Sequence, residues 1–330
     1  MKTNYLMIFA ILIIMFAMLT HPAICVTGAA AGLLTWFNSV LPSLFPFMVL
    51  TGLLIHTGSL NLLSKRLRQI PLLKNLPVTA VFAVITGLLC GYPMGIRTVS
   101  ELKNSHQLSE RQAKILYCFV NQPGPMFVLG YALPLCGFSS GQGTEFFTSF
   151  YGGIAFTAVL SLIISIIEKY FTSKCEIPHS PKYPLPDPPS VLSPDTAATS
   201  SVEAKQVPHF LSAFEEVLLS SMVTLGKIGG YMMLFSMIAT LLGELLPNQP
   251  VLCLLFSGIL EMTSGLALVP TIAQGQTAPT FVLGFIAFGG LSVAAQSFSL
   301  GDLSTREQLR YLLWKIIQVC VTLLIFAGQA

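Results

Sequence analysis

Uncharged polar side chains of this chain gather where apolar segments are interrupted by glycine or proline. The clearest case is FVNQPGPMFVLG at residues 119–130, where the amides of Asn121 and Gln122 precede a Pro-Gly-Pro turn. Amides and hydroxyls at such points can hydrogen-bond a ligand or the backbone groups that the interruption frees. The groups of this kind are Tyr92, Asn121, Gln122, Thr263, Ser264, Ser292 and Gln296. Together they suit a small polar ring or a carboxylate ligand.

Two charged residues stand well inside apolar segments, Lys227 in VTLGKIGGYMMLF and Glu261 in ILEMTSG. A charge at such a position is costly in lipid and by default indicates function. Lys227 could bind a substrate carboxylate; snorkelling, or pairing with Glu261, is the equal alternative. Glu261 could accept a ligand N–H or carry a coupling proton.

The interruptions come in two matching pairs along the chain. LLCGYPMG (88–95) pairs with ILEMTSG (259–265), and NQPGP (121–125) pairs with FGGLSVAAQ (288–296). Glycine lets a ligand approach the backbone, and a new helix N-terminus presents N–H donors with partial positive charge, so Gly289 and Gly290 join the predicted site. A single such interruption is more often a kink or a close helix contact. Their pairing favours one central site for an anionic or polar ligand.

The composition is that of a polytopic membrane protein. Of 330 residues, 53% are hydrophobic and only 9% charged, and the mean hydropathy is +0.75. The formal charge of +3 is too small to indicate a nucleic-acid surface. No motif for a cofactor or a metal is present, so none is expected. The apolar stretches lie near 5–24, 30–60, 76–96, 115–135, 145–167, 211–243, 251–270, 279–300 and 311–327.

Basic residues predict the topology, since they accumulate on the cytoplasmic side of a membrane. Two basic loops, 62–75 and 97–114, flank the stretch 76–96, which must then enter and return as a re-entrant hairpin. The stretch 251–270 lies between two connections without basic residues and is predicted as a hairpin from the outer side. Nine ordinary crossings are the simpler alternative, but they would place one basic loop outside.

These elements predict an all-α polytopic membrane protein with an inverted repeat, re-entrant hairpins and broken helices, the usual build of secondary transporters. We expect an N-terminal transmembrane helix in 1–29, a first repeat in 30–170, a Pro/Ser-rich flexible cytoplasmic linker in 171–209 and a second, inverted repeat in 210–330. A cleaved signal peptide is an alternative for the first segment. Ser109 is expected to cap the helix that follows it.

The segments GYPMGIRTVSELKNSHQLSERQAKILYCFVNQPGPMFVLG, GILEMTSGLAL and AFGGLSVAAQSFSL resemble the YlbJ-type sporulation integral membrane proteins, of the nucleoside-recognition or Gate-domain group. The resemblance covers most of the chain outside the linker. This sequence departs from the family by having Gln122-Pro123 where a pair of small residues usually follows the asparagine. The resemblance implies a fold similar to concentrative nucleoside transporters, and passage of dipicolinate from mother cell to forespore during endospore formation.

We therefore expect a non-enzymatic transporter of a small anionic metabolite. It should be a multi-pass protein in the lipid bilayer of the cell membrane, and in a sporulating cell in the mother-cell or outer forespore membrane. A nucleoside or another small metabolite is the alternative substrate, and a non-transporting membrane sensor or scaffold for sporulation is a further alternative. An enzyme fits poorly, because the five histidines are scattered and no aspartate lies in an apolar segment. A homo-oligomer stays open, and no nucleic-acid partner is expected.

Overall fold

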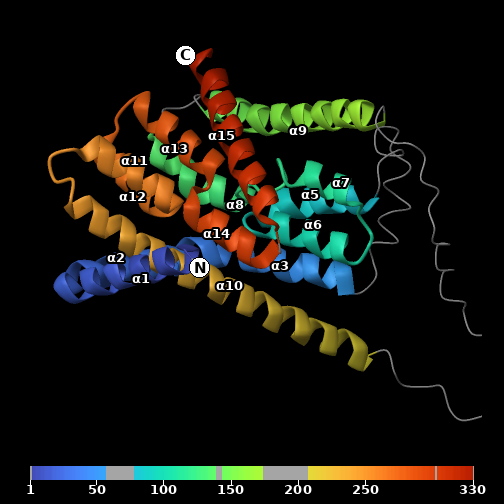
Figure 1. Cartoon of the computed structure of the whole chain (residues 1–330), viewed down its shortest axis with the longest axis horizontal. Helices are drawn as coiled ribbons and strands as arrows, with labels where there is room; N and C mark the ends of the chain where they lie inside the picture. Colours follow the sequence, from blue (N-terminus) through green and yellow to red (C-terminus); the bar gives the residue numbers. More distant parts are fainter. Residues whose placement is uncertain (1, 57–77, 139–142, 174–206, 302, 330) are drawn as a thin grey trace, which may run out of the picture.

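The structure is a computed structural model that describes residues 2–56, 78–138, 143–173, 207–301 and 303–329, and all regular structure in these residues is helical. Five helical stretches in the described part are long and apolar enough to cross a membrane, Pro22–Leu53, Gly143–Ile167, Leu211–Glu244, Thr277–Gly301 and Thr305–Ala327. The chain is thus an all-α polytopic membrane protein (Figure 1).

The first two helices are separated by a proline. Helix α1 (Lys2–Thr20) ends before His21, and Pro22 begins α2 (Pro22–Thr35), which runs through a π turn (Trp36–Val40) into α3 (Leu41–His56). Pro22 has no N–H to continue the ladder of α1, but a first helical position needs none. Residue 29, the predicted end of the N-terminal segment, lies inside α2, and the predicted division into domains stays a prediction.

Helices α5 (Val78–Cys90) and α6 (Met94–Asn104) form a hairpin that turns at residues 91–93. Its two arms lie so close that a Cβ atom on Gly87 would be 3.1 Å from the Cα atom of Gly95. The sequence placed GYPMG at the end of a hairpin and 97–114 in a loop, and both placements need correction. A search for apolar stretches does not predict the arm α6, because this helix is amphipathic, with Ile96, Val99 and Leu102 on its buried face.

The second hairpin joins α11 (Pro250–Leu260) to α12 (Met262–Ile272) through Glu261 alone. A Cβ atom on Gly265 would lie 2.3 Å from the Cα atom of Gly258, a separation that side chains larger than hydrogen do not allow. The prediction that ILEMTSG turns a hairpin is confirmed. The side from which each hairpin enters the membrane stays a prediction.

Each hairpin is followed by an interrupted helix. The first begins with α7 (Glu110–Leu116), where Ser109 and Gln112 form the predicted cap, breaks at residues 117–124, and resumes as α8 (Pro125–Phe127), a π turn (Val128–Ala132) and a 3₁₀ turn (Leu133–Cys136). The second consists of α13 (Thr277–Phe288) and α14 (Gly290–Gly301), separated at Gly289, whose φ is +85°. Glycine takes this left-handed conformation without a steric cost.

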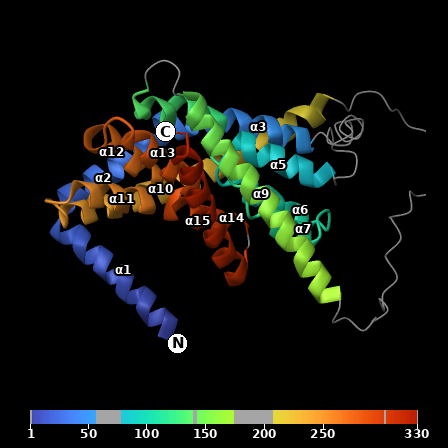
Figure 2. The ribbon, with the colours of Figure 1, turned by 90° about the horizontal axis from the view of Figure 1, so that it is seen from above.

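Long helices complete both halves of the chain. Helix α10 (Val207–Glu244) packs along α2 and α3, and α9 (Gly143–Ser173) packs against α15 (Thr305–Ala327), as Figures 1 and 2 show. The same order of long helix, hairpin, broken helix and long helix thus occurs before and after residues 174–206. Such a shared order is what an inverted repeat requires, while the opposite orientation of the halves stays a prediction. Most of the predicted linker, 171–209, lies outside the described residues.

Candidate ligand-binding site

The four interruptions lie against one another. A Cβ atom on Gly91, at the first hairpin turn, would be 2.6 Å from the backbone nitrogen of Gly124 in the first broken helix. A Cβ atom on Gly289, in the second break, would be 3.1 Å from the ring of Tyr92. A Cβ atom on Gly290 would be 3.0 Å from the backbone nitrogen of Met262, which follows the second hairpin turn. Both hairpin turns and both helix breaks therefore meet at one place.

The prolines of NQPGP explain which backbone groups the first break frees. In a continuous helix the carbonyls of Phe119 and Asn121 would accept from the N–H groups of residues 123 and 125, but both of these are proline. Side chains replace the missing donors: Gln122 Nε2 donates to Phe119 O at 2.8 Å, and Lys315 Nζ donates to Asn121 O at 2.6 Å.

The second break is satisfied in the same way. Helix α13 ends at Phe288, so the carbonyls of Ile286 and Ala287 fall in its last turn, where helical partners are missing. The hydroxyl of Tyr92 donates to Ile286 O at 2.8 Å, and Lys315 Nζ lies 3.3 Å from Ala287 O. Tyr92 and Lys315 thus hold carbonyls of the second half of the chain, and Lys315 also holds one of the first half.

Lys315 is the buried cation that sequence reasoning missed. Its side chain is only 1% exposed, within α15, and it lies inside the apolar stretch 311–327 of the sequence. The available signal was its apolar surroundings in LLWKIIQVC, which are the same kind of context that drew attention to Lys227.

Amides complete the polar contacts behind Tyr92. Gln122 and Gln318 exchange two hydrogen bonds, at 2.9 and 2.8 Å, and both side-chain oxygens lie within 3.4 Å of Lys315 Nζ. Asn121 Nδ2 donates to Ser297 Oγ and to the Tyr311 hydroxyl, both at 2.9 Å. Asn121 Oδ1 has no partner among the described residues. Two of the predicted site residues, Asn121 and Gln122, therefore contact this buried lysine.

A small cavity of about 40 Å³ lies in front of Tyr92. Since one water needs about 10–15 Å³ measured this way, the cavity has room for a few waters and not for an aromatic ring. Its lining combines apolar residues with Ser43, Tyr92, Gly124, Glu261, Thr263 and Gln296. Four of the predicted site residues, Tyr92, Glu261, Thr263 and Gln296, therefore share one cavity.

Glu261 is the charged side chain that the cavity contains. It is 1% exposed, and its Oε2 accepts from the backbone N–H of Ser264 at 2.6 Å and from the hydroxyl of Thr263 at 2.5 Å. The carboxylate thereby caps the N-terminus of α12, a favourable position for negative charge. The α8 segment also begins at the cavity, without a side-chain cap, and α14 contributes Val293 and Gln296 from its first two turns.

The remaining predicted residues occupy different places. Ser292 Oγ accepts from Gln296 Nε2 at 3.1 Å, and Gly289 and Gly290 form the second break. Ser264 donates to Ser236 Oγ at 3.0 Å and lines a separate pocket with residues of α2, α10 and α11.

Lys227 is not part of this arrangement. Its side chain is exposed, and α10 presents Ile228 and Met232 to the cavity instead. No ion pair between Lys227 and Glu261 is found among the described residues. The ligand-binding role predicted for Lys227 has no support from this position and stays a prediction.

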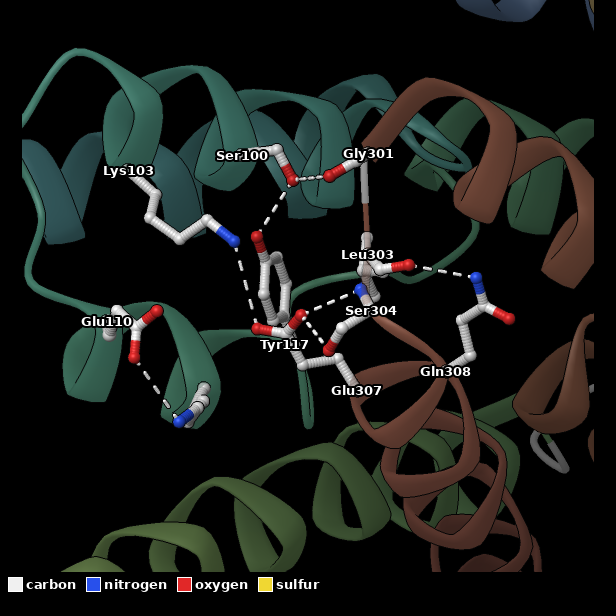
Figure 3. A network of polar contacts seen from close by, with 10 residues as sticks. Ser100, Lys103, Glu110, Tyr117, Gly301, Leu303, Ser304, Glu307 and Gln308 are labelled. Carbon is white, nitrogen blue, oxygen red and sulfur yellow. Dashed lines mark hydrogen bonds and ion pairs between the residues drawn. The ribbon is translucent and has the colours of Figure 1, made fainter.

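A second polar network fastens the first hairpin and α7 to the start of α15 (Figure 3). The hydroxyls of Ser100 and Tyr117 are 2.8 Å apart, and Ser100 also donates to the carbonyl of Gly301. Lys103 pairs with Glu307 at 3.8 Å, while Glu307 closes a capping box with Ser304. These contacts hold α6, α7, α14 and α15 together at one end of the bundle.

Comparison with known proteins gives one informative match. The chain matches no protein-family model, and no solved structure matches it. It is 27% identical over 320 residues to the sporulation integral membrane protein YlbJ of Bacillus subtilis (strain 168), a match that covers 89% of this chain and 75% of that protein. Together with the helical, membrane-type architecture, this similarity supports the resemblance to the YlbJ-type sporulation integral membrane proteins that the sequence motifs indicate.

Proposed function

We propose that this protein transports a small anionic metabolite across the membrane, with dipicolinate during endospore formation as the first candidate. The observation that carries the proposal is the meeting of two hairpin turns and two helix breaks at one small cavity. Interrupted backbone inside a membrane protein is tolerated where it lines a cavity, and in secondary transporters such interruptions surround the substrate. The proposed role is not catalytic, so the transported compound should leave chemically unchanged.

The helix starts around the cavity favour an anion, while Glu261 restricts which anion can enter. The α8 segment and α12 begin at the cavity, and α14 lines it with its first two turns. N–H groups at helix N-termini carry partial positive charge. A dianion beside an ionised Glu261 would be repelled, because both charges would share a poorly hydrated space. We therefore propose that the anion enters together with a proton, held either by Glu261 or by a ligand carboxyl.

Glu261 also favours a second candidate, a nucleoside or related compound. Its carboxylate could accept hydrogen bonds from ring N–H or sugar hydroxyl groups, with Gln296 and Thr263 beside it. Such a ligand is neutral and would need no accompanying proton. A sensor or scaffold is the third candidate, and it differs in binding a ligand without moving it.

Uptake into liposomes containing the purified protein distinguishes these candidates. Radiolabelled dipicolinate and uridine should be tested in parallel, each with and without an inward proton gradient. We expect saturable dipicolinate uptake that the gradient increases. Uptake of uridine alone would favour the second candidate, and binding without uptake would favour the sensor. Absence of both binding and uptake for every small metabolite tested would contradict the transporter proposal.

Two variants connect uptake to the cavity. Glu261→Gln keeps an oxygen that can cap α12 but removes the charge, and Gln296→Leu removes a polar group from the lining. Both should reduce uptake at least about tenfold, a loss of about 1.4 kcal/mol of binding or coupling. Gln107→Leu is the matched control, because Gln107 is exposed in the turn between α6 and α7.

A further inference from the structure

The ammonium group of Lys315 has more oxygen neighbours than it has protons to donate. Five oxygens lie between 2.6 and 3.5 Å from Nζ: the carbonyls of Asn121 and Ala287, the side-chain oxygens of Gln122 and Gln318, and the Tyr92 hydroxyl. An ammonium carries three N–H donors. A surplus of oxygens on several sides is the arrangement expected around a bound cation, rather than around a group that makes a fixed set of hydrogen bonds.

The charge of Lys315 is balanced by dipoles and not by an acid. No ion pair to Lys315 is found among the described residues. Ala287 lies at the C-terminal end of α13, and Asn121 follows the helical turns that begin with α7, so two chain segments direct carbonyl oxygens at the ammonium. Carbonyls at helix C-termini carry partial negative charge. The rings of Tyr92 and Tyr311 add their faces at 5.1 and 5.9 Å from Nζ.

These oxygens come from both halves of the chain, and from three of the four interruptions that meet at the junction. Tyr92 belongs to the first hairpin turn, Asn121 and Gln122 to the first break, Ala287 to the second break and Gln318 to α15. Broken helices in membrane transporters place carbonyls where they coordinate a cation. In this chain a covalently attached ammonium already occupies that place.

We propose that the helix breaks build a binding site for a monovalent cation, and that Lys315 fills this site with its own ammonium group. The side chain acts as a positioning residue that keeps the two halves joined through its charge. Removal of the side chain beyond Cβ, as in Lys315→Ala, empties a site that a small alkylammonium ion can enter.

The test uses an ion of matched size. Truncation to alanine removes three carbons and the nitrogen, which is the composition of n-propylammonium. Purified Lys315→Ala protein should unfold at a lower temperature than wild type, and n-propylammonium chloride should raise the midpoint saturably. At a concentration about 100 times the dissociation constant, the folded-to-unfolded ratio should rise about 100-fold. Propan-1-ol, which has the same shape without the charge, should give little rescue, and tetramethylammonium, which has no N–H donors, should give little as well.

Controls separate the charge from general solvent effects. Wild type should show no saturable response to n-propylammonium because its site is filled. Lys114→Ala should also show none, because the Lys114 side chain is 43% exposed on α7. Ionic strength is kept constant with sodium chloride, and a parallel series in potassium chloride shows whether a bare metal ion also binds.

Lys315→Met keeps the proposal testable if the alanine variant does not fold. Methionine fills much of the lysine volume without charge, so the variant should be less stable than wild type and should not respond to n-propylammonium. A methionine variant as stable as wild type would overturn the proposal, as would equal rescue of Lys315→Ala by propan-1-ol and by n-propylammonium. These experiments measure stability, so their outcome does not depend on whether the protein transports a ligand.

Discussion

The hydroxyl of Tyr92 is one atom on which the junction between the halves depends, and Tyr92→Phe removes it alone. The hydroxyl donates to Ile286 O at 2.8 Å and also lies 3.5 Å from Lys315 Nζ. Without it the Ile286 carbonyl, in the last turn of α13, keeps no donor in a buried position. Such an unsatisfied group costs about 1–3 kcal/mol, and the ring itself is retained, so packing should change little.

Buried cysteines of the chain provide the assay. Cys90 and Cys136 are buried, so a fluorogenic maleimide should react with them as the protein unfolds. A denaturant series at fixed temperature then gives the change in free energy of unfolding. We expect Tyr92→Phe to lose about 1–3 kcal/mol relative to wild type. Tyr151→Phe is the matched control and should lose less than about 0.5 kcal/mol, because Tyr151 is 45% exposed.

A double-mutant cycle with Lys315→Met sharpens the prediction. Tyr92 and Lys315 donate to the neighbouring carbonyls of Ile286 and Ala287 and also contact each other, so their losses should not add. Contacting residues of this kind show interaction energies of about 0.5–3 kcal/mol. A Tyr92→Phe protein as stable as wild type, or strictly additive losses in the cycle, would refute the reasoning that side chains hold the breaks together.

Three further predictions follow from the placement of other residues. Gly265→Leu should prevent the second hairpin from closing, because a Cβ atom there would clash with Gly258, so detergent extraction should yield no folded protein. Gly284→Ala is the control: no atom lies within 4 Å of its Cβ position, so the same extraction should yield folded protein in normal amount. Lys227→Ala should keep wild-type stability within about 0.5 kcal/mol and keep uptake, because the side chain is exposed; loss of uptake with retained folding would restore its predicted binding role. The inverted topology puts the exposed residues Asn248 and Ser105 on opposite sides of the membrane. In a protein whose own cysteines are replaced, Asn248→Cys should react with an impermeant maleimide added outside intact cells, and Ser105→Cys should react only after permeabilisation. Equal labelling of the two variants in intact cells would argue against that topology.

The paired helix breaks could be predicted because glycine and proline mark them directly in the sequence. NQPGP, with two prolines spaced so that carbonyls at 119 and 121 lose their helical donors, permits few other structures. The second hairpin was equally clear, since ILEMTSG lies between two apolar arms. Convergence of the breaks on one place followed from their repeated order and agrees with the contacts found.

The missed features have a common physical cause, which is that hydropathy averages hide residues whose setting changes in the fold. The α6 arm has polar residues on one face, and its low mean hydropathy predicts a loop, although Ile96 and Val99 are fully buried in the fold. Lys315 lies ten residues after the start of α15, close enough to its charged first turn to suggest an interfacial position. Lys227 drew attention by its apolar neighbours, yet one sequence does not reveal which face of a long helix is buried.

The side-chain hydrogen bonds at the breaks also set the energy that the proposed transporter would need to widen this small cavity for a ligand. Separation of the first hairpin and first break from α13 and α15 requires the loss of the hydrogen bonds that join them. These are Tyr92 to Ile286, Lys315 to the Asn121 carbonyl, the two bonds between Gln122 and Gln318, and Asn121 to Tyr311. Four neutral hydrogen bonds and one charge-assisted hydrogen bond amount to roughly 4–9 kcal/mol net. A ligand that moves a two-state protein from 1:99 to 99:1 must supply about 5.5 kcal/mol of differential binding, which is the same order. In the proposed transporter, this arrangement would therefore predominate without a ligand, and the binding energy of one ligand would be sufficient to shift it. A folded variant that lacks one of these bonds, such as Tyr92→Phe, should open more readily for the same reason that it is less stable.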